Sequence, residues 1–136
     1  MTCSKLKKNV KMFSFIPTHN SLTGVMTDHR LASLGDAFVN LVYSLALSGK
    51  NGRPSGAKVK GSLLAEGLRR AGLRPYAPSS MTSHELADAA EALIVYAWLH
   101  GHITLEESVA MLEKDDDPAE ALSRLLEKIV ERIKLS

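Results

Sequence analysis

Apolar residues recur along most of the chain at intervals of three and four, which is the spacing of one face of an α-helix. Alternation of apolar and polar residues, the pattern of a half-buried strand, does not persist beyond a few residues. The pattern therefore predicts an all-α fold of about five to seven helices. The longer helices are expected over about residues 28–47, 57–71, 82–99 and 117–135, with a short helix after Thr104.

Residues that favour helix ends support these boundaries. Thr82 and Glu85 have the spacing of a capping box, and Thr104 and Glu107 repeat it. Asp117 precedes a proline, a residue favoured at the first position of a helix. These signals predict three helix starts.

The remaining stretches are expected to be connections. KNGRPSG and YAPSS are rich in residues that favour turns. Residues 1–26 have weaker periodicity, which we interpret as a short helix over about residues 6–15 followed by a loop. The length of 136 residues predicts one domain over residues 1–136.

Charge is unevenly distributed along the chain. Residues 50–74 contain seven Lys or Arg against Glu66 alone, whereas residues 75–136 contain twelve acids against five Lys or Arg. A basic middle segment beside an acidic second half favours an anionic partner that contacts the middle of the chain. A solvated basic helix explains a block of this size equally well.

Cysteine content and the length of apolar runs bear on the cellular compartment. Cys3 is the sole cysteine, which excludes an intramolecular disulfide and a multi-cysteine zinc site and fits a reducing compartment. No uninterrupted apolar run reaches the roughly eighteen residues of a membrane span, and the first residues lack the apolar stretch of a signal peptide. A cytoplasmic protein with no membrane partner is expected.

Two apolar helices contain acids where acids are costly. Twelve of the fourteen residues in LADAAEALIVYAWL, residues 86–99, are apolar, yet Asp88 and Glu91 lie three apart on one helix face. Asp36 is the only charged residue between Arg30 and Lys50. Buried carboxylates cost several kcal/mol unless something compensates their charge. We therefore expect Asp36, Asp88 and Glu91 to lie on buried helices and to share a compensating partner.

A divalent cation and an ion pair are both candidates for that partner. Mg²⁺ prefers oxygen ligands and is commonly held by one or two carboxylates, with waters and substrate phosphates. The basic segment offers Lys58 and Arg69 as ion-pair partners. Residue chemistry alone leaves these two alternatives open.

Gly35, beside Asp36, points to a close approach. A glycine inside a helix costs about 1 kcal/mol relative to alanine. That cost is tolerable where another backbone or a ligand must come near. The neighbouring small residues suggest that two helices pack closely there.

Two motifs resemble those of the ribonuclease III family. LASLGDAFVNLVYSLA, residues 31–46, resembles the family's signature helix, whose core is Leu-Gly-Asp followed by a small residue. LADAAEALIVYAWL resembles the second motif, Ala-Asp-x-x-Glu-Ala-Leu-Ile. The motifs stand in the family's order, and the likeness covers a core of about residues 27–112.

The resemblance implies an all-helical homodimer that hydrolyses double-stranded or structured RNA in RNA processing, with Mg²⁺ or Mn²⁺ as cofactor. Asp36 and Glu91 match the principal metal-binding acids, and Asp88 matches the acid that supports them. The basic segment would then follow the RNA backbone and read its A-form shape. The residues expected to contact phosphates are Lys58, Lys60, Arg69 and Arg70.

The chain departs from the longer family members at two positions. Ala32 stands where they have a metal-site Glu, and Ser33 stands at an aromatic position that they use at the dimer joint. The signature is closer to the compact Mini-ribonuclease III branch, which lacks a double-stranded-RNA-binding domain. An archaeal-type short member would also look like this.

Three other functions are compatible with the same residues. A catalytically inactive relative that binds RNA or a protein as a dimer would explain Ala32. An all-α nucleoside triphosphate pyrophosphohydrolase would hold Mg²⁺ with the acidic row Glu85, Asp88 and Glu91. Enzymes of that class use acidic pairs on two helices, whereas the first long helix here has only Asp36. A structural bundle with paired buried acids is the third.

Overall fold

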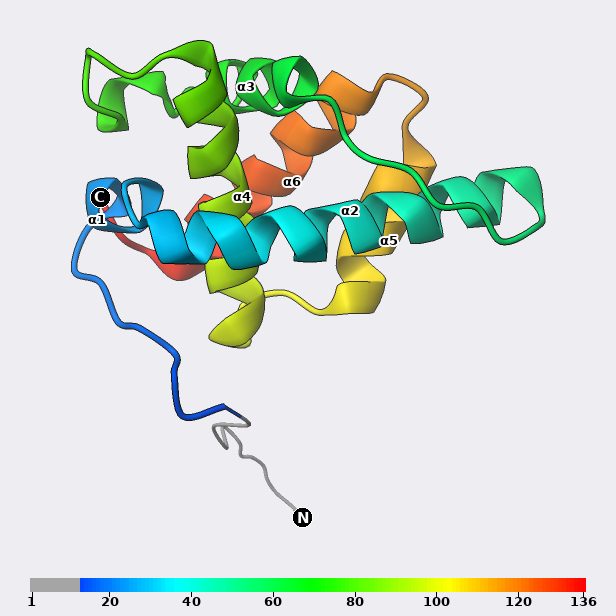
Figure 1. Cartoon of the computed structure of the whole chain (residues 1–136), viewed down its shortest axis with the longest axis horizontal. Coiled ribbons are helices and arrows are strands. Elements are labelled where there is room, and N and C mark those ends of the chain that lie inside the picture. The colour runs from blue at the N-terminus through cyan, green and yellow to red at the C-terminus, as the bar shows by residue number, and fades with distance from the viewer. Residues whose placement is uncertain (1–12) are drawn as a thin grey trace.

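The computed structural model describes residues 13–136, and it is all-helical over that range, as predicted. Figure 1 shows the arrangement. The elements in chain order are α1 (Leu22–Met26), α2 (His29–Asn51), α3 (Gly61–Arg70), the short 3₁₀ helix η1 (Arg74–Tyr76), α4 (Ser83–Leu99), α5 (Leu105–Lys114) and α6 (Pro118–Ile133).

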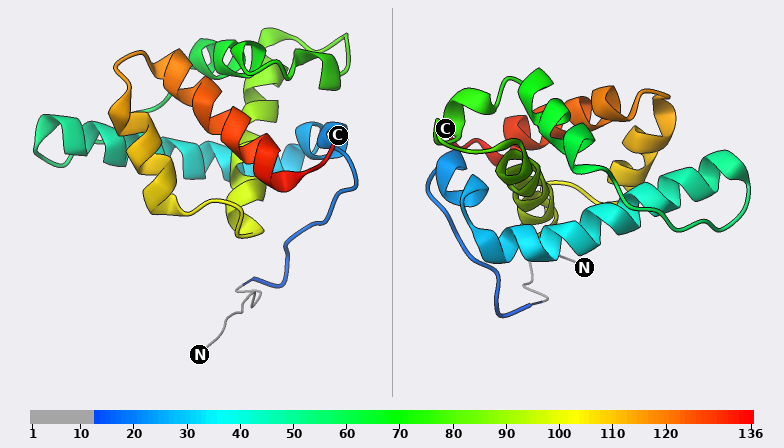
Figure 2. Two further views of the ribbon diagram at one scale, coloured as in Figure 1. Left: turned by 180° about the vertical axis from the view of Figure 1, so that it is seen from behind. Right: turned by 45° about the horizontal axis from the view of Figure 1, so that its top comes forward.

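The central element is α4. From Leu86 to Ala97 every residue of this helix is buried except Asp88. It passes between α2 and α6, and it also contacts α1 and α3 (Figure 1, Figure 2). The uniformly apolar sequence of α4 is therefore explained, because a helix covered on all sides by other helices has no solvent-facing stripe.

The predicted caps are present at the helix starts. The hydroxyl of Thr82 accepts a hydrogen bond from the backbone N–H of Glu85, and the Glu85 carboxylate accepts one from Thr82, which confirms the capping box. Thr104 accepts from the N–H of Glu107, but no reciprocal bond forms there. The Glu107 carboxylate instead accepts two hydrogen bonds of 2.7 Å from Arg132 on α6.

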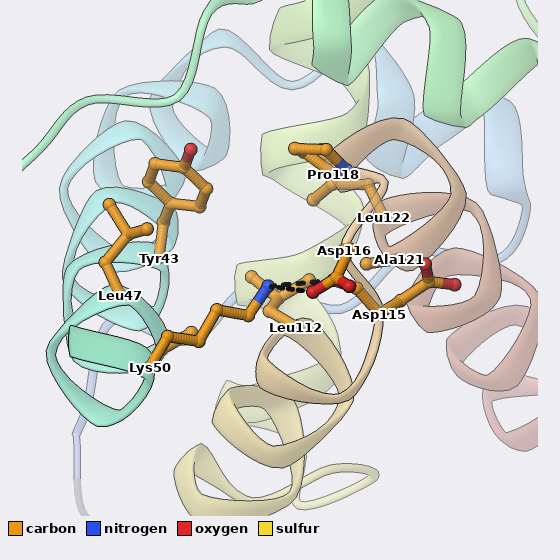
Figure 3. A pocket seen from close by; sticks show the side chains of 10 residues that line it. Tyr43, Leu47, Lys50, Leu112, Asp115, Asp116, Pro118, Ala121 and Leu122 are labelled. Atoms are coloured by element: carbon orange, nitrogen blue, oxygen red, sulfur yellow. Dashed lines mark hydrogen bonds and ion pairs between the residues drawn. The ribbon is translucent and has the colours of Figure 1, made fainter. Parts of the chain in front are cut away.

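Two predicted helix boundaries are wrong. The first long helix was expected to end near residue 47, but α2 continues to Asn51, and its C-cap is Gly52, which has a positive φ of 71°. The last turn is held by Lys50, whose Nζ lies 2.9 Å from the carbonyl oxygen of Asp115 and 3.7 Å from Asp116 Oδ1. These atoms border a small pocket of about 120 Å³ between α2, α5 and α6 (Figure 3).

The second wrong boundary is the start of α3. The helix was expected from about residue 57, but it begins at Gly61, and its C-cap is Ala71. Residues 55–60 precede it without regular secondary structure. Their backbone groups are hydrogen-bonded by side chains of α2, so they do not need a helix to satisfy them.

The N-terminal region also differs from the prediction. Residues 6–12 of the expected first helix lie outside the described residues, and residues 13–15 are not helical. A helix does form later, at α1, where the Ser21 side chain caps it and Leu22, Val25 and Met26 are buried. The periodicity did not indicate this element because five residues are too few to display it.

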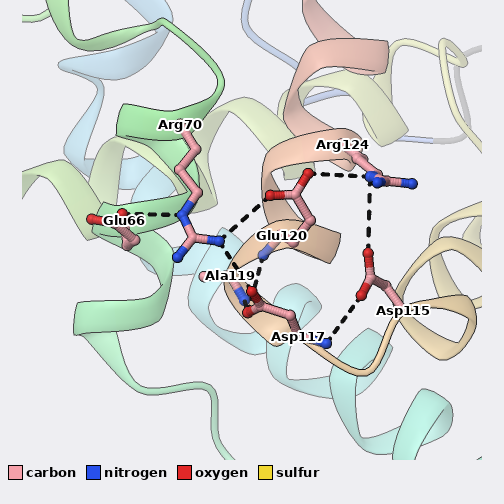
Figure 4. Close-up of polar contacts among 7 residues, drawn as sticks. All are labelled: Glu66, Arg70, Asp115, Asp117, Ala119, Glu120 and Arg124. Carbon is pink, nitrogen blue, oxygen red and sulfur yellow. Dashed lines mark hydrogen bonds and ion pairs between the residues drawn. The ribbon is translucent and has the colours of Figure 1, made fainter.

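An ion-pair network joins α3 to α6 (Figure 4). The Nε of Arg70 lies 3.0 Å from Glu66 Oε2, and its Nη1 lies 3.1 Å from Asp117 Oδ2 at the start of α6. The hydrogen bond from Arg70 lowers the pKa of Asp117. Close packing supports the same junction, because a Cβ on Gly67 would lie 2.9 Å from the Cβ of Leu122.

Within the described residues, α2 is long and apolar enough to span a membrane by length and composition alone. Core helices often have the same profile, and 39% of the relevant window is buried in this fold.

Candidate functional site

An open cleft of about 520 Å³ lies where α2, α4 and the start of α3 meet. All three acids singled out in the sequence border it: Asp36 from α2, and Asp88 and Glu91 from α4. Lys58, in the segment before α3, borders it as well. The other lining residues are His29, Ala32, Ser33, Gly61, Leu64, His84 and Ala87.

Gly35 is what brings the two acid-bearing helices together. A Cβ at this position would lie 2.2 Å from the carbonyl oxygen of Glu91 and 2.6 Å from its carbonyl carbon. No side chain fits there, so the backbones of α2 and α4 meet at Gly35. The prediction of a close backbone approach is confirmed, and the contact places Asp36 beside Glu91.

The three acids differ in exposure. Glu91 is buried, with 6% of its surface accessible, whereas the Asp88 side chain is 36% exposed and Asp36 is exposed. The expectation that all three are buried was therefore wrong for Asp36 and Asp88. Gly35 occupies the contact with α4, so the next residue, Asp36, lies at the edge of the interface and faces the open cleft.

Glu91 occupies an electrostatically unfavourable position. Burial, followed by hydrogen bonding to Asp36 and the negative charges of Asp36 and Asp88, raises its pKa to about 8. Lys58 acts in the opposite direction, but less strongly. At neutral pH this cluster therefore binds a proton or requires another positive charge.

Ion pairs do not supply that charge. Among the described residues, neither Asp36 nor Glu91 has a basic group within 4.0 Å, and Asp88 lies 3.8 Å from Nε2 of the exposed His84. Of the two partners suggested by the sequence, Lys58 borders the cleft without such a pair, and Arg69 lies 3.9 Å from Glu66. The ion-pair alternative is therefore not favoured.

Asn40 orients one of the acids. Its Nδ2 donates a hydrogen bond of 3.2 Å to Asp36 Oδ1, and its Oδ1 accepts one of 2.8 Å from the N–H of Val59. The sequence motifs did not single out this residue. Its position four residues after Asp36, inside an apolar helix, was the available signal.

Two histidines were also missed as residues of this site. His29 and His84 line the cleft at the starts of α2 and α4. Neither belongs to a recognisable metal-binding spacing, so no sequence pattern pointed to them.

The carboxylates of the cleft suit a cation that keeps part of its water shell better than one whose ligands all come from the protein. No group of three or more His, Cys, Asp or Glu side chains within residues 13–136 is arranged to hold a metal ion. Mg²⁺, however, usually takes one or two carboxylates and completes its shell with waters and substrate phosphates. Asp36 and Glu91 provide two adjacent carboxyl groups whose repulsion such a cation would relieve.

Not all of the predicted phosphate contacts lie at this cleft. Lys58 lines it, and Lys60 is the exposed N-cap residue of α3, immediately before Gly61. Arg69 and Arg70 lie at the opposite end of α3, roughly 14 Å away at 1.5 Å per residue. The acids Glu66 and Asp117 engage them there.

Comparison with protein families gives a match over most of the chain. The family model described as ribonuclease III matches residues 29–135, a range that contains α2 to α6 and all three acids of the cleft. A comparison with curated proteins found no match. The matched range covers most of the chain, and the chain therefore belongs to the ribonuclease III family.

Proposed function

We propose that this protein is an endoribonuclease that cleaves double-stranded or structured RNA with Mg²⁺, or with Mn²⁺ in its place. The observation that carries the proposal is the adjacency of Asp36 and Glu91 across the contact between α2 and α4. Their negative charges have no basic partner within ion-pairing distance among the described residues. Membership of the ribonuclease III family favours RNA as the substrate.

The residues have distinct roles in the proposed reaction. A bound divalent cation would supply an activated water and positive charge at the scissile phosphate. Asp36 and Glu91 hold it from two helices, and Asp88, one helical turn before Glu91, keeps the site negative and orients its ligands. Lys58 borders the same cleft and favours the entry of a phosphate.

RNA would lie along the segment before α3. Lys58 and Lys60 are exposed there, so we retain them as phosphate contacts. We assign Arg70 to the α3–α6 junction instead, because its guanidinium is engaged by Glu66 and Asp117. Arg69 lies on the same distant turn, with a weaker pairing to Glu66.

We also propose that the protein acts as a homodimer. Leu34, Leu41 and Leu45 of α2 are 39%, 49% and 39% exposed. Positions seven and eleven residues apart lie on one side of a helix, so these leucines form an apolar stripe suited to a second copy. A dimer would present two cleavage sites to one RNA duplex.

Ala32 favours a second candidate function. It lines the cleft at the position where longer members of the family have a metal-site Glu. An inactive relative that binds structured RNA would tolerate this loss, whereas a nuclease must act with one acid fewer.

A cleavage assay on long double-stranded RNA tests the proposal. We expect cleavage in Mg²⁺ or Mn²⁺ and none with a chelator. Asp36→Asn and Glu91→Gln each remove a cation-holding oxygen, so each should reduce the rate by about 100-fold or more, and Asp88→Asn by about 10–100-fold. Glu127→Gln, at an exposed site on α6 outside the cleft, is the matched control and should cleave like the parent.

Two results would count against the proposed nuclease. An Asp36→Asn variant that cleaves as fast as the parent would remove this cleft from the mechanism. If the parent protein binds RNA in a salt-sensitive way but cleaves it with neither metal, the protein is an inactive RNA-binding member of the family.

A further inference from the structure

Residues 55–59 run back along α2 after the helix ends, on the way to α3 (Figure 1). Three polar side chains of α2 bind alternate residues of this segment. The N–H of Ser55 donates to Ser48 Oγ at 2.8 Å, and the N–H of Ala57 donates to Ser44 Oγ at 2.9 Å. The N–H of Val59 donates to Asn40 Oδ1 at 2.8 Å.

We call these three pairs the side-chain ladder: Ser48 with Ser55, Ser44 with Ala57, and Asn40 with Val59. Its regularity has a geometric cause. Four residues of an α-helix rise about 6.0 Å, and two residues of an extended chain advance about 6.6 Å. The two repeats nearly coincide, so side chains at every fourth helical position meet every second residue of the segment.

The ladder leads to the candidate metal site. One further step of four along α2 reaches Asp36, and one further step of two along the segment reaches Gly61. Both residues line the cleft. The ladder therefore ends where the acids of the cleft meet the start of α3.

Of the three α2 side chains in the ladder, Asn40 lies nearest the cleft. Both the oxygen and the nitrogen of its amide form hydrogen bonds. With Oδ1 accepting from Val59, Nδ2 is left to donate to Asp36 Oδ1 at 3.2 Å. This bond engages Oδ1 of Asp36 and fixes the orientation of its carboxylate beside Glu91. Within residues 13–136, Ser44 and Ser48 bind the segment and hydrogen-bond to no acid of the cleft.

We propose that Asn40 is a positioning residue that couples the divalent cation to the RNA-contacting segment. It fixes the carboxylate of Asp36 for the cation, and by holding Val59 it keeps the preceding Lys58 at the cleft. Resting on the proposed function, this inference adds that cation affinity depends on a residue that does not bind the cation.

Calorimetric titration with Mn²⁺ in the absence of RNA tests the inference. Asn40→Ala should weaken Mn²⁺ binding by about 10–100-fold, as is typical when a partner of a metal ligand is removed. Ser44→Ala is the matched control, because it removes the hydrogen bonds between Ser44 and Ala57 and leaves the bond between Asn40 and Asp36 in place. Its affinity for Mn²⁺ should stay within about twofold of the parent, and circular dichroism should show both variants folded.

The outcomes separate this inference from the proposed function. If Asp36→Asn abolishes Mn²⁺ binding while Asn40→Ala binds Mn²⁺ like the parent, the positioning role is wrong and the metal site stands. If Asn40→Ala and Ser44→Ala weaken Mn²⁺ binding equally, the ladder as a whole matters, and the specific role of Asn40 is overturned. If Asp36→Asn binds Mn²⁺ like the parent, both the metal site and the role of Asn40 fail.

Discussion

Gly35→Ala is expected to lower the free energy of unfolding by about 3 kcal/mol or more, with a matching fall in the thermal unfolding midpoint followed by circular dichroism. The added methyl would lie 2.2 Å from the carbonyl oxygen of Glu91. Backbone atoms cannot rotate out of its way, so α2 and α4 must separate. Helix propensity alone predicts the opposite sign, since alanine is favoured over glycine by about 1 kcal/mol.

Gly49→Ala on the same helix is the control for that substitution. The three atoms nearest to a Cβ there all belong to the carboxylate end of Glu113, a flexible and exposed side chain that can move away. This variant should unfold within about 1 kcal/mol of the parent, in the stabilising direction that propensity predicts. A Gly35→Ala protein as stable as Gly49→Ala would refute the close backbone contact.

The second large effect is a dependence of stability on pH that originates at Glu91. Its pKa is raised from 4.5 to about 8 on folding, so between these values the folded protein binds a proton that the unfolded chain has released. Stability in a chelating buffer should therefore fall as pH rises from about 4.5 to about 8. One pKa unit corresponds to about 1.4 kcal/mol, so the loss should reach several kcal/mol.

Urea unfolding of the parent and of Glu91→Gln across this pH range measures the effect. The amide cannot ionise, so the variant should lack this loss and should be more stable than the parent at the alkaline end. The difference between the two proteins is the informative quantity, because other groups titrate too. Burial lowers the pKa of His102, for example, so the unfolded chain binds a proton there more readily than the folded protein does. His102 therefore makes the free energy of unfolding rise with pH.

Adding Mg²⁺ at the alkaline end should stabilise the parent, because a cation that binds the folded state shifts the unfolding equilibrium. It should have little effect on Glu91→Gln. Parallel pH profiles for the two proteins would contradict the assignment of the uncompensated charge to Glu91.

Local signals in the sequence predicted much of this structure. The capping box at Thr82 and the cap at Asp117 marked helix starts correctly, because caps depend on residues within one turn. The glycine inside the first long helix predicted the close approach that Gly35 makes. The acids in apolar surroundings led to the cleft, because a charge is costly wherever burial is expected.

Contacts between distant residues account for what the sequence did not predict. α3 begins at Gly61 and not near residue 57, because side chains of α2 form hydrogen bonds with the backbone between these positions. Those side chains lie thirteen to nineteen residues earlier in the chain. The ion pair of Arg70 was likewise not predicted, because its partner Asp117 lies 47 residues further along the chain. The exposure of Asp36 likewise depends on how α2 crosses α4, which the helical period alone does not fix.

The central claim is that Asp36 and Glu91 hold one divalent cation between them. The most direct measurement is anomalous diffraction from crystals of the protein grown with Mn²⁺. We predict an anomalous peak within bonding distance of both carboxylates and its loss in crystals of Asp36→Asn. Manganese bound elsewhere with no peak in the cleft, or a peak that persists in Asp36→Asn, would contradict the claim.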